Sequence, residues 1–364
     1  MPKEIPALAT PAHLIPKGTC TCNLSMIDTS CYLTVPADTL HQSSGRQLLF
    51  DLGCRKDFRN LPAPIADVID LKVPGIKVDS DLADILIKGA TNLKNIEAAI
   101  VSHHHYDHTG NPAALVVGPG FSDAFMPGYP TNQDSPLYEN AFKGRDAHEM
   151  DFSDCQIIAG YPARDFFGDG SLYILSTPGH AIGHISALVR TDESSFAFLG
   201  AEICHFGGSF RPTLYLPMPS SISSSDLSRD DNPAQEYPPA IFTGRHPKAY
   251  SCRTTPYYEV CAREDSWHVN PPVAGASIDK LKSLDANGDV LVLIAHDPIA
   301  SKVLPLFPAG TLNVWELTDW KTKLRWGFLD ELPQEDRKRK YLVDGTYRKG
   351  KLVKPLDILD VNPT

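Results

Sequence analysis

The chain has 364 residues, and its 34 basic and 44 acidic side chains give a formal net charge of −10 at pH 7. Hydrophobic residues make up 42% and charged residues 21%, which is typical of an ordinary globular protein with a buried core. An acidic chain of this kind is poorly suited to nucleic acid or to an anionic membrane surface, so we expect neither as a partner.

The longest uninterrupted aliphatic run covers residues 290–295, far short of the roughly 18 residues that span a bilayer. The first residues of the chain contain no apolar segment of the kind found in a secretory signal. We therefore expect a cytoplasmic protein whose eight cysteines are reduced.

The first part of the chain is predicted to form an arm, a hairpin and a helix. Residues 1–18 are rich in proline and are predicted to be an N-terminal arm. Residues 19–36 have a β-like composition, and residues 47–53 read as a strand that enters a hairpin. The apolar spacing of residues 80–87 predicts a helix.

An apolar strand predicted at residues 96–101 leads directly into the run Ser102-His103-His104-His105-Tyr106-Asp107-His108-Thr109-Gly110. Imidazole nitrogens and carboxylates are preferred ligands of zinc and of neighbouring first-row metals. His103 and His105 are two residues apart, so on an extended backbone their side chains project to the same side. Asp107 and His108 follow once the chain has begun to turn, and we expect them to face a second ion.

The rest of the chain alternates between predicted strands and long loops. Residues 116–150 and 207–250 are rich in proline and are predicted to be irregular loops that cover a site. Helices are predicted at residues 277–284 and 299–306. The predicted strands are residues 156–159, 172–176, 185–190, 195–199 and 290–295, of which the second to fourth form a β-meander.

Metal-binding side chains recur where these strands end. The residues that share this position, besides the cluster at 103–108, are Asp51, His180, Glu202 and His296. A ligand at the end of a rigid strand is held in place by the scaffold, so the pattern favours a metal centre over scattered surface histidines.

On these residues the chain resembles the metallo-β-lactamase superfamily, over roughly residues 30 to 310. The run Ser-His-x-His-x-Asp-His-x-Gly is highly specific for that family, and His296 in its Ala-His-Asp context is similar to the lactonase-type and fungal branches. The resemblance implies an αββα sandwich, an α+β fold of four layers in which two mixed β-sheets are flanked by helices. We expect an arm at 1–18, a catalytic domain at 19–325 and a C-terminal extension at 326–364 packed on it.

The resemblance also implies a ligand set for two zinc ions per chain, with iron or manganese as alternatives. His103, His105 and His180 would bind the first ion. Asp107, His108 and His296 would bind the second. Glu202 stands where the family has a bridging aspartate, and its longer side chain means that either the strand end retreats or the bridge is lost.

The chemistry that this implies is attack by a metal-bound hydroxide on a carbonyl group. Asp107 would orient the hydroxide and carry the proton to the leaving atom. His205 lies three residues after Glu202, where the lactonase branch has a tyrosine, and would donate a hydrogen bond to the substrate. His184 is interpreted as a structural residue or one that orients a ligand, with direct catalysis as the alternative. Asp51 is interpreted as a structural residue that ties the ligand loops together beneath the metals, and Cys204 is likewise interpreted as structural.

A second group of histidines carries no spacing argument. His246 and His268 are interpreted as ordinary core or surface residues.

The function predicted from these features is opening of a cyclic ester or cyclic amide in a small, fairly apolar molecule, with detoxification as the expected role. One alternative is a thioesterase of the glyoxalase II or polyketide-release type. The basic residues Lys338 and Arg339 are compatible with the anionic glutathione thioesters that the glyoxalase type binds. Another is a metal-binding sensor or scaffold with little turnover. A nuclease would need a basic channel that the sequence does not offer. A homodimer is the one protein partner that we consider.

Overall fold

The computed structural model describes residues 3–12, 15–29, 37–41, 44–73, 75–110, 115–142, 147–227, 235–244, 246–264, 266–332 and 344–356. Within these residues no helix is long and apolar enough to cross a membrane. The chain divides into two compact units. The meander unit comprises Met1–Asn23, Phe152–Pro305 and Thr311–Arg339, and the cluster unit comprises Leu24–Asp151, Leu306–Gly310 and Lys340–Thr364. The basic residues Lys338 and Arg339 lie outside the described residues.

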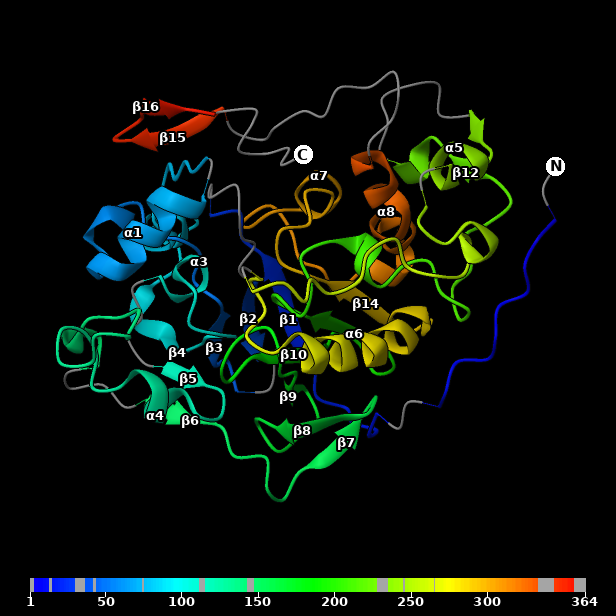
Figure 1. Ribbon diagram of the computed structural model, residues 1–364. Helices are drawn as coiled ribbons and strands as arrows, with labels where there is room; N and C mark the ends of the chain where they lie inside the picture. The colour runs from blue at the N-terminus through cyan, green and yellow to red at the C-terminus, as the bar shows by residue number, and fades with distance from the viewer. Residues whose placement is uncertain are drawn as a thin grey trace. The chain divides into compact units, whose positions relative to one another are not determined.

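The cluster unit is built around a six-stranded mixed sheet, which Figure 1 shows in blue to green. Its strands, in their order across the sheet, are β1 (Cys22–Met26), β2 (Ala37–His41), β3 (Gln47–Phe50), β4 (Ile96–Ile100), β5 (Leu115–Val117) and β6 (Ala147–Glu149). The β2–β3 pair is the predicted antiparallel hairpin, whereas β3 to β6 run parallel. Parallel strands end at the same edge of a sheet, so the residues that follow β3 and β4 are brought together.

The described residues of the cluster unit also form four α-helices and a small hairpin. They are α1 (Ala63–Lys72), α2 (Leu82–Lys88), α3 (Tyr106–Thr109), α4 (Phe121–Phe125), and the pair β15 (Gly345–Arg348) and β16 (Lys351–Pro355). Leu82 and Leu86 of α2 pack on Leu49 and Ala99 of the sheet in one buried cluster. Their spacing of four residues places both leucines on the same face of the helix, which is why this predicted helix forms where it does.

The meander unit contains the second six-stranded mixed sheet. Its strands, in order across the sheet, are β14 (Val290–Leu293), β11 (Phe196–Leu199), β10 (Ile185–Arg190), β9 (Leu172–Ser176), β8 (Tyr161–Asp165) and β7 (Gln156–Ile158). β9, β10 and β11 pair antiparallel as the predicted meander, and β14 joins β11 in parallel. The remaining elements are β12 (Ile222–Ser223), β13 (Glu236–Tyr237), α5 (Ala240–Thr243), α6 (Pro271–Ala286), α7 (Ala300–Val303) and α8 (Trp320–Trp326).

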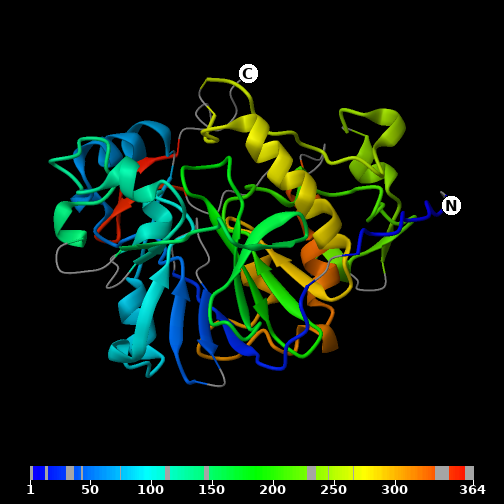
Figure 2. The ribbon, with the colours of Figure 1, turned by 90° about the horizontal axis from the view of Figure 1, so that it is seen from below.

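Helix α6 covers the sheet of the meander unit, as Figure 2 shows with the helix in yellow above the green strands. Ile278, Leu281 and Leu284 of α6 are buried against β-strand residues such as Leu188 and Val292. The helix begins at two prolines after Asn270, whose side chain accepts a hydrogen bond from Val273 N at 3.3 Å. Proline at the first helical positions and asparagine before them are common helix starts.

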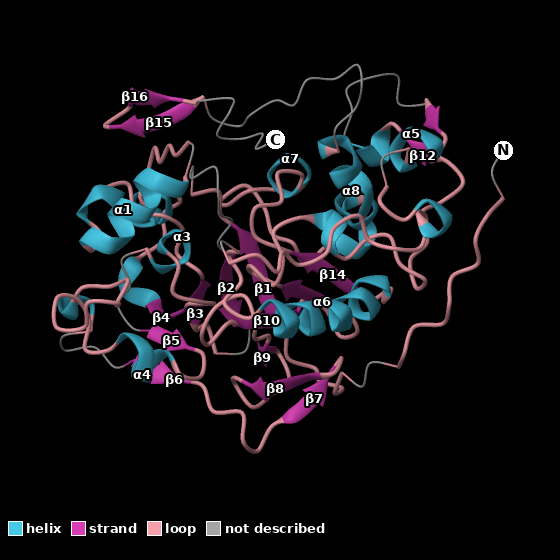
Figure 3. Ribbon diagram, viewed as in Figure 1, coloured by secondary structure: helices cyan, strands magenta, loops and turns pink. Residues whose placement is uncertain are grey.

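Two regions depart from the sequence prediction. Residues 116–150 are not simply an irregular loop, because they contain most of β5, α4 and β6. Strands of three residues are too short to show an alternating pattern, which explains the error. β8 was not predicted, since its proline weakens the strand signal. In the second predicted loop, the described residues 207–227, 235–244 and 246–250 contain short elements only (Figure 3).

Residues 326–332 pack into the meander unit. Trp326, Phe328 and Leu329 are buried in one apolar cluster with Met218 and Tyr257. The segment that directly follows α8 therefore contributes to the same core as the loops between β11 and α6.

The close approach of α6 to the turn after β9 predicts a specific mutational effect. Gly179 has a φ of 123°, and a Cβ there would lie 2.1 Å from Ala274 N and 2.7 Å from Val273 C. Neither backbone atom can move without shifting α6, so Gly179→Ala should lower the free energy of unfolding by about 3 kcal/mol. Urea unfolding monitored by circular dichroism measures this change.

Gly275→Ala in α6 is the matched control, because beyond the neighbouring backbone of its own helix no heavy atom lies within 4 Å of the added Cβ. Replacing a glycine inside a helix by alanine should raise stability by about 0.5–1 kcal/mol. Equal stability of the Gly179→Ala variant and the wild-type protein would show that the turn is not held against α6.

Candidate metal centre

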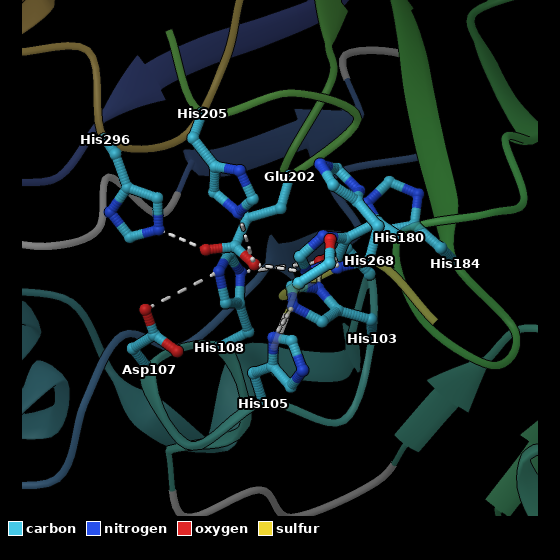
Figure 4. Close-up of polar contacts among 12 residues, drawn as sticks. His103, His105, Asp107, His108, His180, His184, Glu202, His205, His268 and His296 are labelled. Carbon is cyan, nitrogen blue, oxygen red and sulfur yellow. Dashed lines mark hydrogen bonds and ion pairs between the residues drawn. The ribbon is translucent and has the colours of Figure 1, made fainter. Parts of the chain in front are cut away.

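The cluster unit brings His103, His105 and His108 together directly after β4. His103 Nε2 lies 2.9 Å from His105 Nδ1, and the rings of His103 and His108 have centroids 4.2 Å apart (Figure 4). The predicted projection of His103 and His105 to the same side is therefore confirmed. His103 and His108 are almost fully buried.

A buried carboxylate beneath these histidines determines which ring nitrogen carries a proton. Ser102 Oγ donates to Asp51 Oδ2 at 2.9 Å and lies 3.0 Å from His103 Nδ1. Because the hydroxyl has given its one proton to Asp51, it accepts from His103 Nδ1, and the lone pair of His103 is on Nε2. His108 Nδ1 lies 2.7 Å from the same Asp51 oxygen, so its lone pair is also on Nε2. With this tautomer a metal would be bound through Nε2 while a hydrogen bond holds Nδ1.

The other residues of the run separate into two groups. Asp107 is buried at the start of α3, and its Oδ2 lies 4.0 Å from His108 Nε2. His104 instead stacks on Phe125, with ring centroids 4.3 Å apart, and Tyr106 packs on the apolar cluster around α1. His104 and Tyr106 therefore pack against apolar side chains outside the ligand group.

In the meander unit, the turn that carries His180 is held by the start of α6. Ser277 Oγ donates to Pro178 O at 2.7 Å, and Val269 N donates to His180 O at 2.9 Å. His184 Nδ1 lies 2.9 Å from Thr177 O at the other end of the turn, as expected of a residue with an orienting role.

Glu202 is the centre of the ligand group in the meander unit. Its carboxylate, at 4% exposure, contacts two histidines through different oxygens. Oε2 lies 2.5 Å from His180 Nε2, and Oε1 contacts His296 Nε2 (Figure 4). His205 Nε2 lies 3.6 Å from Oε2, and its half-exposed ring stacks on that of His296. The structure thus brings together every predicted site residue of this unit.

His268 is a neighbour of this group that sequence reasoning missed. Its ring centroid lies 5.1 Å from that of His180 and 5.2 Å from that of His205. No spacing within residues 266–270 indicates this position, because it depends on the hydrogen bond between Val269 N and His180 O.

The backbone is strained at three of the strand ends that carry the proposed site residues. Asp51 after β3, Ala201 after β11 and His296 after β14 have φ values of 58°, 47° and 62°. Non-glycine residues adopt this left-handed conformation rarely and at a cost, and such strain clusters at functional sites.

Two ionisable groups beside the histidines have shifted pKa values. Burial raises the pKa of Asp297, which follows His296, to about 6. Burial likewise raises the pKa of the Cys204 thiol to about 12. A thiol with that pKa is protonated at neutral pH and is a poor nucleophile, in agreement with a structural role for Cys204.

The donor sets suit a first-row transition metal. Each unit supplies imidazole nitrogens together with buried carboxylate oxygens, and the tautomers of His103 and His108 put the lone pair on Nε2. Mixed nitrogen and oxygen donors of this kind favour zinc, iron or manganese over calcium and magnesium, which prefer oxygen ligands alone.

Comparison with known proteins shows the family. No protein-family model matches the chain. It is 36% identical to "Gamma-lactamase FDB1" of Fusarium pseudograminearum, over 90% of this chain and 86% of that protein. It is 34% identical to "Metallo-hydrolase mfmC" of Annulohypoxylon moriforme, over 91% of this chain and 91% of that protein. The chain belongs to the fungal branch of the metallo-β-lactamase superfamily.

Its similarity to relatives named γ-lactamase and metallo-hydrolase identifies the chain as a metal-dependent hydrolase. The two mixed sheets with flanking helices are those of the metallo-β-lactamase fold, so the predicted fold class is confirmed. Among solved structures the chain is similar to a quorum-quenching N-acyl homoserine lactone lactonase, with 15% identity and a TM-score of 0.45, over 80% of this chain and 99% of that one.

The buried Asp51 predicts an effect on metal affinity. Asp51→Asn keeps the shape of the side chain but removes the charge that holds the tautomers of His103 and His108. Zinc affinity should fall about 10- to 100-fold, the usual cost of losing a residue that orients a metal ligand. Competition with a chromophoric chelator measures this affinity.

Asp154→Asn, at an exposed aspartate, is the control for the change of charge. Unchanged zinc affinity in a folded Asp51→Asn chain would contradict the role given to Asp51.

Proposed function

We propose that the chain opens the ring of a small lactam or lactone, using a binuclear metal centre. The proposal rests on the two oxygens of Glu202, each of which contacts a different ligand histidine. It is supported by the name of the relative from Fusarium pseudograminearum, which describes that protein as a γ-lactamase.

The proposed ligands are those that the family resemblance implies. His103, His105 and His180 would hold one ion. Asp107, His108 and His296 would hold the other, and zinc is the metal we propose. The orientation of His103 and His108 by Asp51 supports both assignments.

Glu202 is proposed to bridge the ions in place of the family's aspartate. A carboxylate that bridges two metals must direct one oxygen toward the ligands of each. Oε2 faces His180 and Oε1 faces His296, which belong to different proposed ions. The longer glutamate is therefore able to act as the bridge, and the strained Ala201 immediately before it marks where the backbone adjusts.

The bound metals would polarise the scissile carbonyl and lower the pKa of the attacking water. The chain's own residues then have two tasks. Asp107, whose carboxylate is buried, would take the proton of the water and deliver it to the leaving nitrogen or oxygen. His205, which is half exposed beside Glu202, would donate a hydrogen bond to the oxygen or nitrogen of the opened ring.

The same proposal includes the finer expectations from the sequence. The substrate is a small molecule, the location is the cytoplasm and the role is detoxification. The acidic composition supports a neutral or weakly polar substrate rather than a polyanion.

Hydrolysis by the purified chain tests the proposal. Zinc-loaded protein should open simple γ-lactams and γ-lactones faster than S-acyl glutathione thioesters, and dialysis against a chelator should abolish the activity. Glu202→Ala should lower kcat by about 100-fold or more, because it removes a residue that binds the metals. Glu202→Asp, which restores the family's residue, should retain more activity than Glu202→Ala.

Glu316→Ala, at an exposed glutamate, is the control. Preference for the thioester would identify the glyoxalase II type instead. Zinc binding without turnover on any of the three substrates would favour a sensor or scaffold.

A further inference from the structure

Three histidine rings of the meander unit form a nearly equilateral triangle. The ring centroids of His180 and His205 are 5.0 Å apart, those of His180 and His268 5.1 Å, and those of His205 and His268 5.2 Å. One nitrogen from each ring lies within 4.8 Å of the other two. Figure 4 shows the three rings grouped beside Glu202.

These distances agree with those of three imidazoles on one tetrahedral ion. With a Zn–N distance of about 2.0–2.1 Å, the centre of a bound imidazole lies about 3.2 Å from the metal. Two such rings at the tetrahedral angle have centroids about 5.2 Å apart. All three observed separations are within a few tenths of an ångström of this value.

Separate backbone elements hold each member of the triangle. Val269 N donates to His180 O, and Asn270 N donates to Gly179 O, both at 2.9 Å, so His268 is tied to the turn of His180. His205 follows the buried residues Ile203 and Cys204 after β11.

The loop that carries His205 is also anchored further along the chain. Arg211 donates to both carboxylate oxygens of Asp285 in α6, at 2.8 and 2.6 Å, and to Leu324 O at 2.7 Å. Burial alone would raise the pKa of Asp285, but the charge of Arg211 holds it below its usual value. The ion pair fixes this loop to the helix that also positions His268.

Other buried histidines of the same unit contrast with this triangle. His184 lies against Thr177 O, and His246 Nε2 lies 2.9 Å from Thr255 O while its Nδ1 accepts from Lys248 N at 3.0 Å. Those rings are engaged by the backbone, as structural histidines usually are. His180, His205 and His268 instead face one another.

We propose that His180, His205 and His268, all in the meander unit, form a further site for a divalent first-row metal ion. Zinc is the metal we propose. Glu202 Oε2, at 2.5 Å from His180 Nε2 and 3.6 Å from His205 Nε2, supplies a negative charge beside it. His205 and His268 are half exposed, so the ion is reached from solution.

This site goes beyond the proposed hydrolytic centre, because His205 and His268 are not ligands there. The two sites share His180, whose ring serves one ion at a time. An ion bound at this further site should therefore compete for His180 with the first ion of the hydrolytic centre. Only this expected competition rests on the proposed function.

A cobalt titration of the full-length chain tests the site. In a His103→Ala/His105→Ala chain, Co²⁺ should still bind with the intense visible absorption of a tetrahedral complex. Adding His268→Ala should weaken that binding at least tenfold, as should adding His205→Ala. Adding His148→Ala, which removes an exposed histidine of β6, should leave binding unchanged.

Tetrahedral Co²⁺ binding that His268→Ala and His205→Ala leave unchanged would overturn the proposal, since the ion would then be bound elsewhere. Failure of the folded double variant to bind Co²⁺ would also overturn it. Circular dichroism shows whether each variant is folded. If the double variant does not fold, the same titrations are made in the His105→Ala chain, where adding His268→Ala should again weaken Co²⁺ binding at least tenfold, and unchanged binding would contradict the site. Hydrolysis by the wild-type chain is measured separately, so either proposal can fail without the other.

Discussion

The packing of α6 against the turn after β9 is the constraint on which the ligand group of the meander unit depends. Gly179 lies so close to Ala274 that a single added carbon would overlap the helix backbone. Hydrogen bonds from Ser277, Val269 and Asn270 to this turn complete the contact. The helix thereby determines the position of His180 and places His268 beside it. A rigid turn of this kind holds a metal ligand without a large loss of side-chain entropy when the metal binds.

In the cluster unit a single carboxylate has the corresponding role. Asp51 accepts hydrogen bonds from the backbone and the hydroxyl of Ser102 and contacts His108. A buried carboxylate without such partners would be costly, and charge-assisted hydrogen bonds offset that cost. The same bonds fix the tautomers of two ligand histidines. The free energy of unfolding and the orientation of the ligand histidines therefore depend on the same three donors, Ser102 N, Ser102 Oγ and His108 Nδ1. The left-handed backbone of Asp51 is strained in this arrangement.

The parts of the site that could be predicted from the sequence are those determined by local spacing. His103 and His105 follow a strand at alternate positions, and the strands from β9 to β11 are short apolar runs separated by turns, so the shared direction of the two histidines and the meander were predicted correctly. His268 could not be predicted, because only a hydrogen bond to a distant turn places it beside His180. The short strand β6 was missed because three residues carry no periodic signal, and parallel pairing with β5 stabilises it instead. Glu202 illustrates a third case. The sequence identified it as a departure from the family, but only the structure shows its two oxygens directed at two histidines.

The central proposal is that the ligand set assigned above binds two metal ions. Anomalous X-ray diffraction at the zinc absorption edge, from crystals of the zinc-loaded full-length chain, tests it most directly. The account predicts one zinc ion bound by His103, His105 and His180 and a second bound by Asp107, His108 and His296, with Glu202 contacting both. Zinc ions whose ligands all come from one unit, or no bound zinc at all, would contradict it.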